Sequence, residues 1–180
     1  MARGFSQVYG QDYFETYAPV ARLTSIRVLL AVAARHRLHV HQMDVKTAFL
    51  YGDLDEEIYM DQPDGYIDDQ ELVCRLRKSL YGLKQAPRVW YKVIDAFFKL
   101  QGFKKSTCDL AVYIKKDGDT LLLVVTVYVD NLLITGANMA EIDQLKEALK
   151  QSFNMSDLGQ VKNLLGMQIK HLEDRSLFLH

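Results

Sequence analysis

Two carboxylates, Asp44 and Asp130, stand where β-like segments end. Asp130 and Asn131 separate the apolar run 121–129 from the run 132–134. Asp-Asn between two such runs predicts a β-hairpin with these two residues as its turn, because both tolerate a positive φ angle. Carboxylates that folding brings together from distant parts of a chain suit a two-metal phosphoryl-transfer site. The alternative is structural: Asp44 ends a strand and Asp130 fills a turn.

Four other segments accompany this hairpin along the chain. They read QDYFETYAPVAR (11–22), MDVKTAFL (43–50), SLYGLKQAPRVW (79–90) and LLGMQI (164–169), and the hairpin itself reads YVDN (128–131). In the order in which they lie along the chain, these five segments resemble the reverse transcriptase domain of copia-type LTR retrotransposons, which is part of a Pol polyprotein. The resemblance extends over nearly the whole chain.

The resemblance implies a fold and a reaction. The fold is α+β, with a polymerase palm-type antiparallel sheet, helices on one face and partial fingers, in one domain over residues 1–180. The family's N-terminal fingers strand, thumb and ribonuclease H segment are expected to be absent. The reaction is RNA-directed DNA synthesis, in which a primer 3′-hydroxyl on an RNA or DNA template attacks a deoxynucleoside triphosphate (dNTP). Two Mg²⁺ ions are expected, with Mn²⁺ as a substitute, and the remainder of a Pol polyprotein is an expected partner.

Three residues form the implied catalytic centre. Asp44 and Asp130 correspond to the family's metal-binding pair, whereas Asn131 stands where the family has a second aspartate. Asn131 keeps the size and turn preference of aspartate but lacks its charge. We therefore expect impaired polymerase activity. The alternative is a catalytically inactive remnant that folds and binds nucleic acid.

Further family positions are implied to contact substrates. Phe49 would exclude a ribose 2′-hydroxyl, and its alternative is a core phenylalanine. Gly82 and Lys84 precede a helix whose first backbone amides could face phosphate or template, although a plain loop is the alternative. The implied substrate-binding residues are Phe49, Tyr81, Gly82, Lys84 and Tyr128, and the implied primer grip comprises Leu165, Gly166 and Met167.

Charged residues are clustered in two stretches. The basic stretch interleaves cations with aromatic residues, which suits a template strand, and a solvated face is an equally good alternative. The acidic stretch lacks the spacing of a calcium-binding loop and is interpreted as a solvated surface. The basic residues are Arg75, Arg77, Lys78, Lys84, Arg88 and Lys92, and the acidic ones are Asp53, Asp55, Glu56, Glu57, Asp61 and Asp64.

Composition narrows the class of protein. The chain is 49% hydrophobic and 25% charged, as in globular proteins, and its net charge of −1 provides no global basic field. Cys74 and Cys108 form no metal-binding or disulfide pattern, which favours an intracellular setting. No secretory signal is evident, and no apolar stretch is long enough to cross a membrane.

Periodicity predicts mixed helices and strands. Strand candidates are 40–43, 58–61, 72–76, 110–116, 121–129, 132–135 and 164–169, with Asp117-Gly118 as a hairpin turn. Three helices are predicted: one from Thr24 or Ser25 to about Arg37, one with Pro87 in its first turn and Gly102 at its end, and one capped by Asn138.

Overall fold

The computed structural model describes residues 2–67, 72–171 and 177–179. Two compact units divide the chain: unit 1 comprises Met1–Ala18 and Ala48–Ala96, and unit 2 comprises Pro19–Thr47 and Phe97–His180. That the chain forms one family domain stays a prediction. The α-helices are α1 (Leu23–His36), α2 (Ala86–Leu100) and α3 (Met139–Ser152), and the 3₁₀-helices are η1 (Gly4–Ser6) and η2 (Ala48–Tyr51). The strands are β1 (His39–Val45), β2 (Asp53–Asp61), β3 (Val73–Lys78), β4 (Lys104–Lys105), β5 (Val112–Asp117), β6 (Thr120–Tyr128), β7 (Asn131–Gly136), β8 (Met155–Gln160), β9 (Asn163–Leu164), β10 (Met167–His171) and β11 (Leu177–Leu179).

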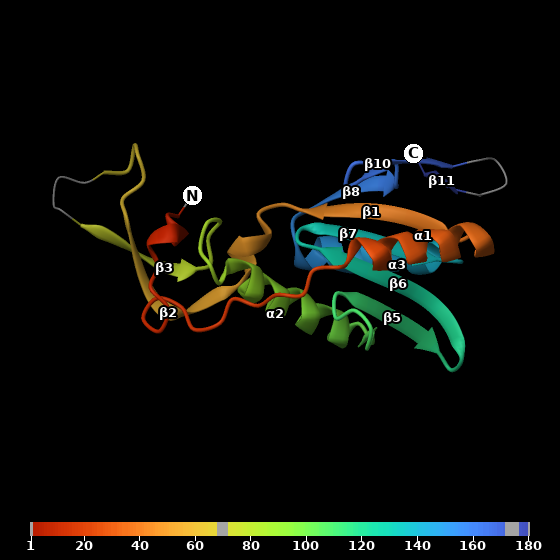
Figure 1. Cartoon of the computed structure of the whole chain (residues 1–180), viewed down its shortest axis with the longest axis horizontal. Coiled ribbons are helices and arrows are strands. Elements are labelled where there is room, and N and C mark those ends of the chain that lie inside the picture. Colours follow the sequence, from red (N-terminus) through yellow and green to blue (C-terminus); the bar gives the residue numbers. More distant parts are fainter. Residues whose placement is uncertain (1, 68–71, 172–176, 180) are drawn as a thin grey trace. The chain divides into compact units, whose positions relative to one another are not determined.

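A six-stranded sheet forms the centre of unit 2. Its strand order is β4-β5-β6-β7-β1-β8, and every pairing in it is antiparallel (Figure 1). β6 and β7 form a hairpin, and β1 inserts between β7 and the edge strand β8. The predicted α+β class is confirmed. This strand order brings the end of β1 beside the start of β7, although the two segments are far apart in the sequence.

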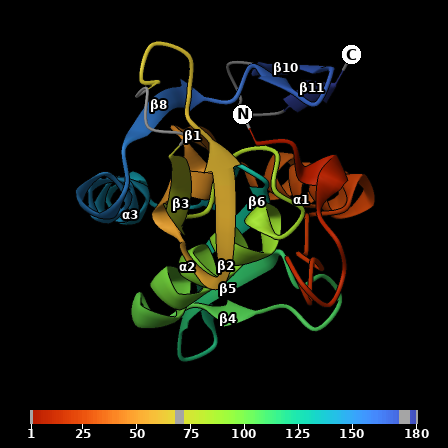
Figure 2. The ribbon, with the colours of Figure 1, turned by 90° about the vertical axis from the view of Figure 1, so that its left-hand side faces the viewer.

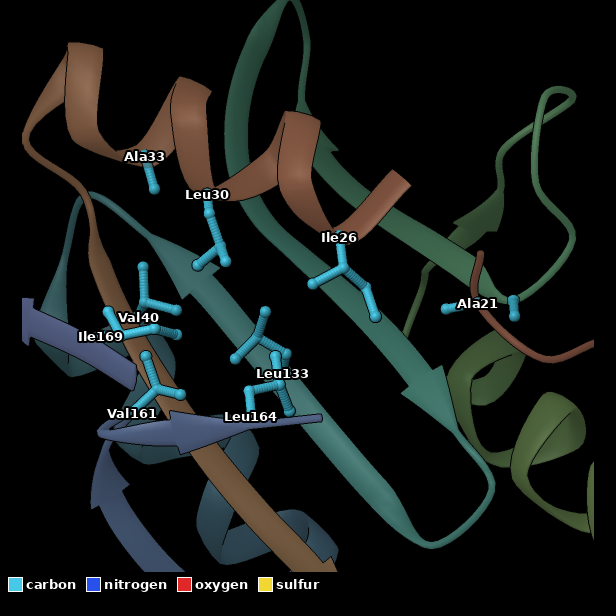
Figure 3. Packing of buried hydrophobic residues seen from close by; sticks show 10 residues of the cluster. Ala21, Ile26, Leu30, Ala33, Val40, Leu133, Val161, Leu164 and Ile169 are labelled. Carbon is cyan, nitrogen blue, oxygen red and sulfur yellow. The ribbon is translucent and has the colours of Figure 1, made fainter. Parts of the chain in front are cut away.

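Helices cover both faces of this sheet, so the prediction of helices on one face is wrong. Ile26 and Leu30 of α1 share a core cluster with Val40 and Leu133 of the sheet (Figure 3). α3 reaches the other face, because its Lys146 contacts His41, which follows Val40 and therefore points the opposite way. The physical reason is the sequence of the central strands. β6 and β7 are nearly continuous apolar runs, and such strands need cover on both sides.

The helix ends follow local signals only in part. Asn138 caps α3, where its side chain accepts a hydrogen bond from the amide of Ala140 at 2.9 Å, as predicted. Pro87 lies in the first turn of α2, also as predicted. Neither Thr24 nor Ser25 caps α1, because the helix begins at Leu23 and no side chain of its N-cap residue makes the capping bond. A distant residue, Asp109, stabilises that end of the helix instead.

Asp109 acts as a tertiary cap for α1. Its carboxylate accepts hydrogen bonds from Arg22 N (3.0 Å), Ser25 Oγ (2.6 Å) and Ala111 N (3.1 Å). Burial by itself would raise the pKa of Asp109, but these hydrogen bonds hold it below the ordinary value of 3.8. The same anchor lies next to β6, since Ala21 N donates to Val127 O and Val127 N donates to Ala111 O. Asp109 therefore ties α1 to the strand that leads into the candidate site.

Unit 1 is built around the antiparallel pair β2–β3 (Figure 2). Ile58, Leu83 and Ala86 form its buried core, with Phe49 packed against them. β2 begins at Asp53, earlier than the predicted segment 58–61, so the acidic stretch from Asp53 to Asp61 is itself part of a strand. No helix in the described part of the chain is long and apolar enough to span a membrane.

Candidate active site

The β6–β7 hairpin has a different turn from the predicted one. Tyr128 pairs with Asn131, so the two-residue turn consists of Val129 and Asp130, and Asn131 is the first residue of β7. The positive φ angle falls on Val129 (58°). A positive φ in a β-branched residue is strained, and such strain is retained where the surroundings enforce it. The Asp-Asn turn prediction is therefore wrong by one residue, and Asp130 is left at the tip.

Asp44 lies beside this turn. It is the sixth residue of β1, inside the strand and not after it, and its Cα partner across the ladder is Asn131. The next residue, Val45, donates its backbone N–H to the carbonyl oxygen of Asp130 at 2.9 Å. The sheet register therefore brings together the two carboxylates that the sequence singled out.

The two carboxylates affect each other electrostatically. Burial raises the pKa of Asp44 above 3.8, and the negative charge of Asp130 raises it further, whereas Lys46 opposes the shift. Both side chains are half-buried. Two like charges at one end of a sheet repel each other unless a cation lies between them.

Asn131 is held by hydrogen bonds on both sides of its amide. Gln42 Nε2 donates to Asn131 Oδ1 at 2.7 Å, and Asn131 Nδ2 donates to Asp130 Oδ1 at 3.2 Å. Sequence reasoning gave Gln42 no role. The signal was available, because Gln42 precedes Asp44 by two residues on a strand and therefore shares its face.

The donor set at this hairpin fits Mg²⁺. Mg²⁺ commonly takes one or two carboxylates and completes its shell with phosphate oxygens and water. Asp44 and Asp130 supply the carboxylates, and both retain access to solvent. Among the described residues no group of three or more His, Cys, Asp or Glu side chains is arranged so that it could hold a metal ion, here or elsewhere. Asn131, which lies next to Asp130, is neutral and adds no third carboxylate to this site.

A second polar cluster lies on the opposite face of the sheet. The buried Lys146 contacts His41 Nδ1 at 2.8 Å and Asp157 Oδ1 at 3.0 Å. Burial lowers the pKa of His41, and the Lys146 ammonium lowers it further. Lys150 also approaches Asp157, at 3.7 Å, from a more exposed position. This cluster joins α3 to β1 and β8.

In unit 1, two of the implied substrate-binding residues form an aromatic pair. The rings of Phe49 and Tyr81 stack with centroids 5.6 Å apart and an interplanar angle of 27°. Phe49 is half-buried against the core of unit 1, whereas Tyr81 is 64% exposed. Both the core alternative and the substrate role of Phe49 are compatible with this position.

Gly82 and Lys84 contact the N-terminal segment of the chain. A Cβ atom on Gly4 would lie 1.8 Å from the carbonyl oxygen of Gly82, so the close backbone approach at this loop is to Gly4. Lys84 Nζ donates to Gln7 O at 3.0 Å and lies 4.9 Å from the centroid of the Tyr13 ring. These contacts fasten the N-terminal segment to the loop before α2.

The basic stretch of unit 1 is largely paired with acidic residues. Cross-strand register places Asp53 opposite Lys78, and their charged atoms are 3.3 Å apart. Arg88 pairs with Glu15, and its guanidinium also donates to the carbonyl oxygen of Tyr17. The remaining pairs are Arg75–Glu57 and Lys92–Asp55. Arg75, Lys78 and Lys92 therefore pair with residues of the acidic stretch, although the two stretches were interpreted separately from sequence.

The implied primer grip is a tight hairpin. Leu164 pairs with Met167, and the turn residues Leu165 and Gly166 have φ angles of 50° and 81°. Positive φ at both central residues is the pattern of a type I′ turn. The single strand predicted over 164–169 is therefore wrong, because a turn divides it into β9 and β10.

The chain matches a known protein family over almost its whole length. The family described as reverse transcriptase (RNA-dependent DNA polymerase) matches residues 1–176. The chain belongs to this family. No solved structure matches the chain significantly.

The curated relatives of this reverse transcriptase chain include plant transposon polyproteins. The Retrovirus-related Pol polyprotein from transposon TNT 1-94 of Nicotiana tabacum is 46% identical over an alignment of 182 residues, which covers 99% of this chain and 14% of that protein. The corresponding polyproteins from transposons RE2 and RE1 of Arabidopsis thaliana are 39% and 38% identical over 96% and 99% of this chain. The chain spans only 12% and 13% of their lengths. The resemblance to copia-type elements is confirmed.

Proposed function

We propose that this chain is the nucleotidyl-transfer core of an RNA-directed DNA polymerase, weakened by Asn131. Its substrates are dNTPs and a primer on an RNA or DNA template. The observation that carries the proposal is the register of β1 against β7, which sets Asp44 beside the Asp130 turn. Unit 2, with its antiparallel sheet, corresponds to the palm, and unit 1 corresponds to part of the fingers.

In this proposal Asp44 and Asp130 hold Mg²⁺, or Mn²⁺ in its place. The bound ions would lower the pKa of the primer 3′-hydroxyl and stabilise the charge on the leaving pyrophosphate. The chain's own contribution is position. The β1–β7 ladder fixes Asp44, and the backbone hydrogen bond from Val45 to Asp130 fixes the turn.

The remaining proposed roles follow the family motifs. Phe49, stacked on Tyr81, excludes the ribose 2′-hydroxyl of a ribonucleotide. Gly82, Lys84 and Tyr128 complete the nucleotide and template contacts. Leu165, Gly166 and Met167 form the primer grip, and the exposure of Leu165 at the β9–β10 turn supports a contact role.

Asn131 favours a second candidate, a remnant that binds primer-template without extending it. The amide contributes no negative charge to a site that must hold divalent cations beside phosphates. It also already hydrogen-bonds Gln42 and Asp130. We rank weak polymerase activity first, because the two carboxylates and the hairpin that carries one of them are intact.

Primer extension on an RNA template with Mg²⁺ tests the proposal. Incorporation of dNTPs by the purified chain that disappears in Asp130→Ala supports a working core. Asp119→Ala is the matched control, because Asp119 occupies the same place in the β5–β6 turn and is exposed. Absence of incorporation by a folded chain, with primer-template binding retained, favours the remnant.

The Asn131→Asp variant tests the reason for weakness. We expect it to raise metal-dependent incorporation, because a carboxylate restores the missing charge. Unchanged incorporation in an otherwise active chain would rule out Asn131 as the cause.

A Phe49→Ala variant tests the sugar contact. It should incorporate ribonucleotides in addition to dNTPs. Continued rejection of ribonucleotides, with dNTP incorporation retained, assigns Phe49 to the core of unit 1 alone.

A further inference from the structure

A chain of hydrogen bonds runs along one face of the sheet to the hairpin tip. Gln42 Nε2 donates to Asn131 Oδ1 at 2.7 Å, and Asn131 Nδ2 donates to Asp130 Oδ1 at 3.2 Å. Gln42 is 8% exposed, and Asn131 is half-buried. Three side chains from β1, β7 and the turn are thereby connected in one direction.

The donor-to-acceptor direction of these hydrogen bonds follows from the carboxylate of Asp130, at which they end. An ionised carboxylate only accepts hydrogen bonds, so Asp130 requires a donor from Asn131. Asn131 must then present Nδ2 to Asp130 and leave Oδ1 for Gln42, whose amide has to donate. The reversed arrangement would set two acceptors, Asn131 Oδ1 and Asp130 Oδ1, against each other.

Burial makes the arrangement of Gln42 costly to change. A buried amide group without a hydrogen-bond partner keeps the full cost of its desolvation. Gln42 reaches Asn131 from the diagonal position on the neighbouring strand, because Leu133 is its direct partner. The Asn131 amide is therefore held from β1 by Gln42 as well as from the turn by Asp130.

We propose that Gln42 is a positioning residue that holds Asn131 as a hydrogen-bond donor to Asp130. Asn131 then orients the Asp130 carboxylate, and its own carbonyl oxygen is engaged by Gln42 and does not ligate the cation. This inference rests on the proposed function, since it assigns Asp130 to a cation. It gives the asparagine a role of its own, distinct from that of a weak metal ligand.

The first experiment reads the hydrogen bonds directly, without any metal. The side-chain NH₂ signals of Asn131 in a ¹⁵N-labelled full chain are assigned by their absence from Asn131→Ala. We expect Asp130→Ala to shift these signals and accelerate their exchange with water. Gln42→Met should change both quantities to a smaller extent. If the signals are unchanged in Asp130→Ala but shift and exchange faster in Gln42→Met, the Asn131 amide is reversed and the proposal is overturned.

The second experiment measures Mn²⁺ affinity of the full chain by titration of free Mn²⁺ with electron paramagnetic resonance. Loss of groups that orient metal ligands typically weakens binding about tenfold or more, so we expect about a tenfold loss in Gln42→Met. The same change in the Asn131→Ala background should have no further effect, because Gln42 acts through Asn131. Equal losses in both backgrounds would overturn the proposal.

Controls separate this inference from the proposed function. Gln168→Met alters an exposed glutamine of β10 and should leave both measurements unchanged. The thermal midpoint of each variant shows that it is folded. If no variant binds Mn²⁺, Asn131→Asp included, the metal-dependent function fails, and the NMR result alone still decides the order of the hydrogen bonds.

Discussion

The two units differ in how far their paired charged side chains are exposed to solvent. In unit 1, Lys78 and Asp53 form an ion pair whose side chains are 54% and 81% exposed. In unit 2, the Lys146 side chain is only 6% exposed where it meets Asp157, and Asp109 is 7% exposed. Water screens the pair in unit 1, whereas the charges in unit 2 depend on a few fixed partners.

The difference indicates where substitution should matter. Exposed cross-strand pairs neutralise a surface and contribute little to folding. Partly buried charges hold elements together, since removing one partner leaves the other desolvated and unpaired. Around the candidate site this second kind prevails. The hydrogen bonds of Asp109 hold the segment beside β6, and Lys146 contacts β1 on the face of the sheet that α3 covers.

The largest effect should come from Lys146→Met. Removing the ammonium leaves Asp157 without its closest cation and His41 without its donor, which should lower the free energy of unfolding by about 3 kcal/mol. Urea denaturation measures this loss. The matched control is Lys150→Met, because Lys150 also approaches Asp157 but from a side chain 38% exposed, and a much smaller loss is expected there. Equal losses in the two variants would remove the contrast.

Asp109→Asn should have the next largest effect and should depend on pH. The neutral amide loses the charge-assisted bonds to Arg22 N and Ser25 Oγ, which should lower the free energy of unfolding by about 2 kcal/mol at pH 7. Because folding lowers the pKa of Asp109, its contribution is complete above about 3.8, the unfolded value, and is lost as pH falls through the folded value.

Denaturation of both proteins at several pH values measures this dependence. The stability gap between wild type and Asp109→Asn should close below about pH 4. Asp119→Asn, a substitution in an exposed turn, is the matched control. A gap that is constant with pH would mean that the charge of Asp109 does not matter.

The smallest effect should come from Lys78→Ala in unit 1. The exposed pair with Asp53 should contribute no more than about 0.5 kcal/mol, and added salt should reduce that further. Denaturation at low and high ionic strength measures both quantities. A loss above about 1 kcal/mol that persists in high salt would place this pair with the buried charges of unit 2.

The sequence predicted many elements because their signals are local. Pro87 in the first turn of α2 and the Asn138 cap of α3 were identified from single residues and their neighbours. The apolar runs of β6 and β7 indicated their own strands within one or two residues. β8 was missed, because its sequence MSDLGQ has no apolar periodicity and is a strand only through pairing with β1.

The sequence also predicted some parts of the candidate site, but not others. The motifs pointed to Asp44 and Asp130, and the register of β1 with β7 brings them together. The turn was misplaced by one residue, because local preference puts Asp-Asn there, whereas the ladder pairs Asn131 with Tyr128 and forces Val129 to a positive φ. Pairing across many ladder bonds overrides a preference of single residues.

The sequence by itself determined the family, the mixed α+β class and the identity of the two carboxylates, because motifs and periodicity are written in neighbouring residues. Only the tertiary structure decided that helices cover both faces, that Asp109 caps α1, that the charge stretches of unit 1 pair with each other, and that Gln42 reaches Asn131. Each of these is a contact between segments distant in the sequence. Such contacts depend on strand order and register, which local patterns do not encode.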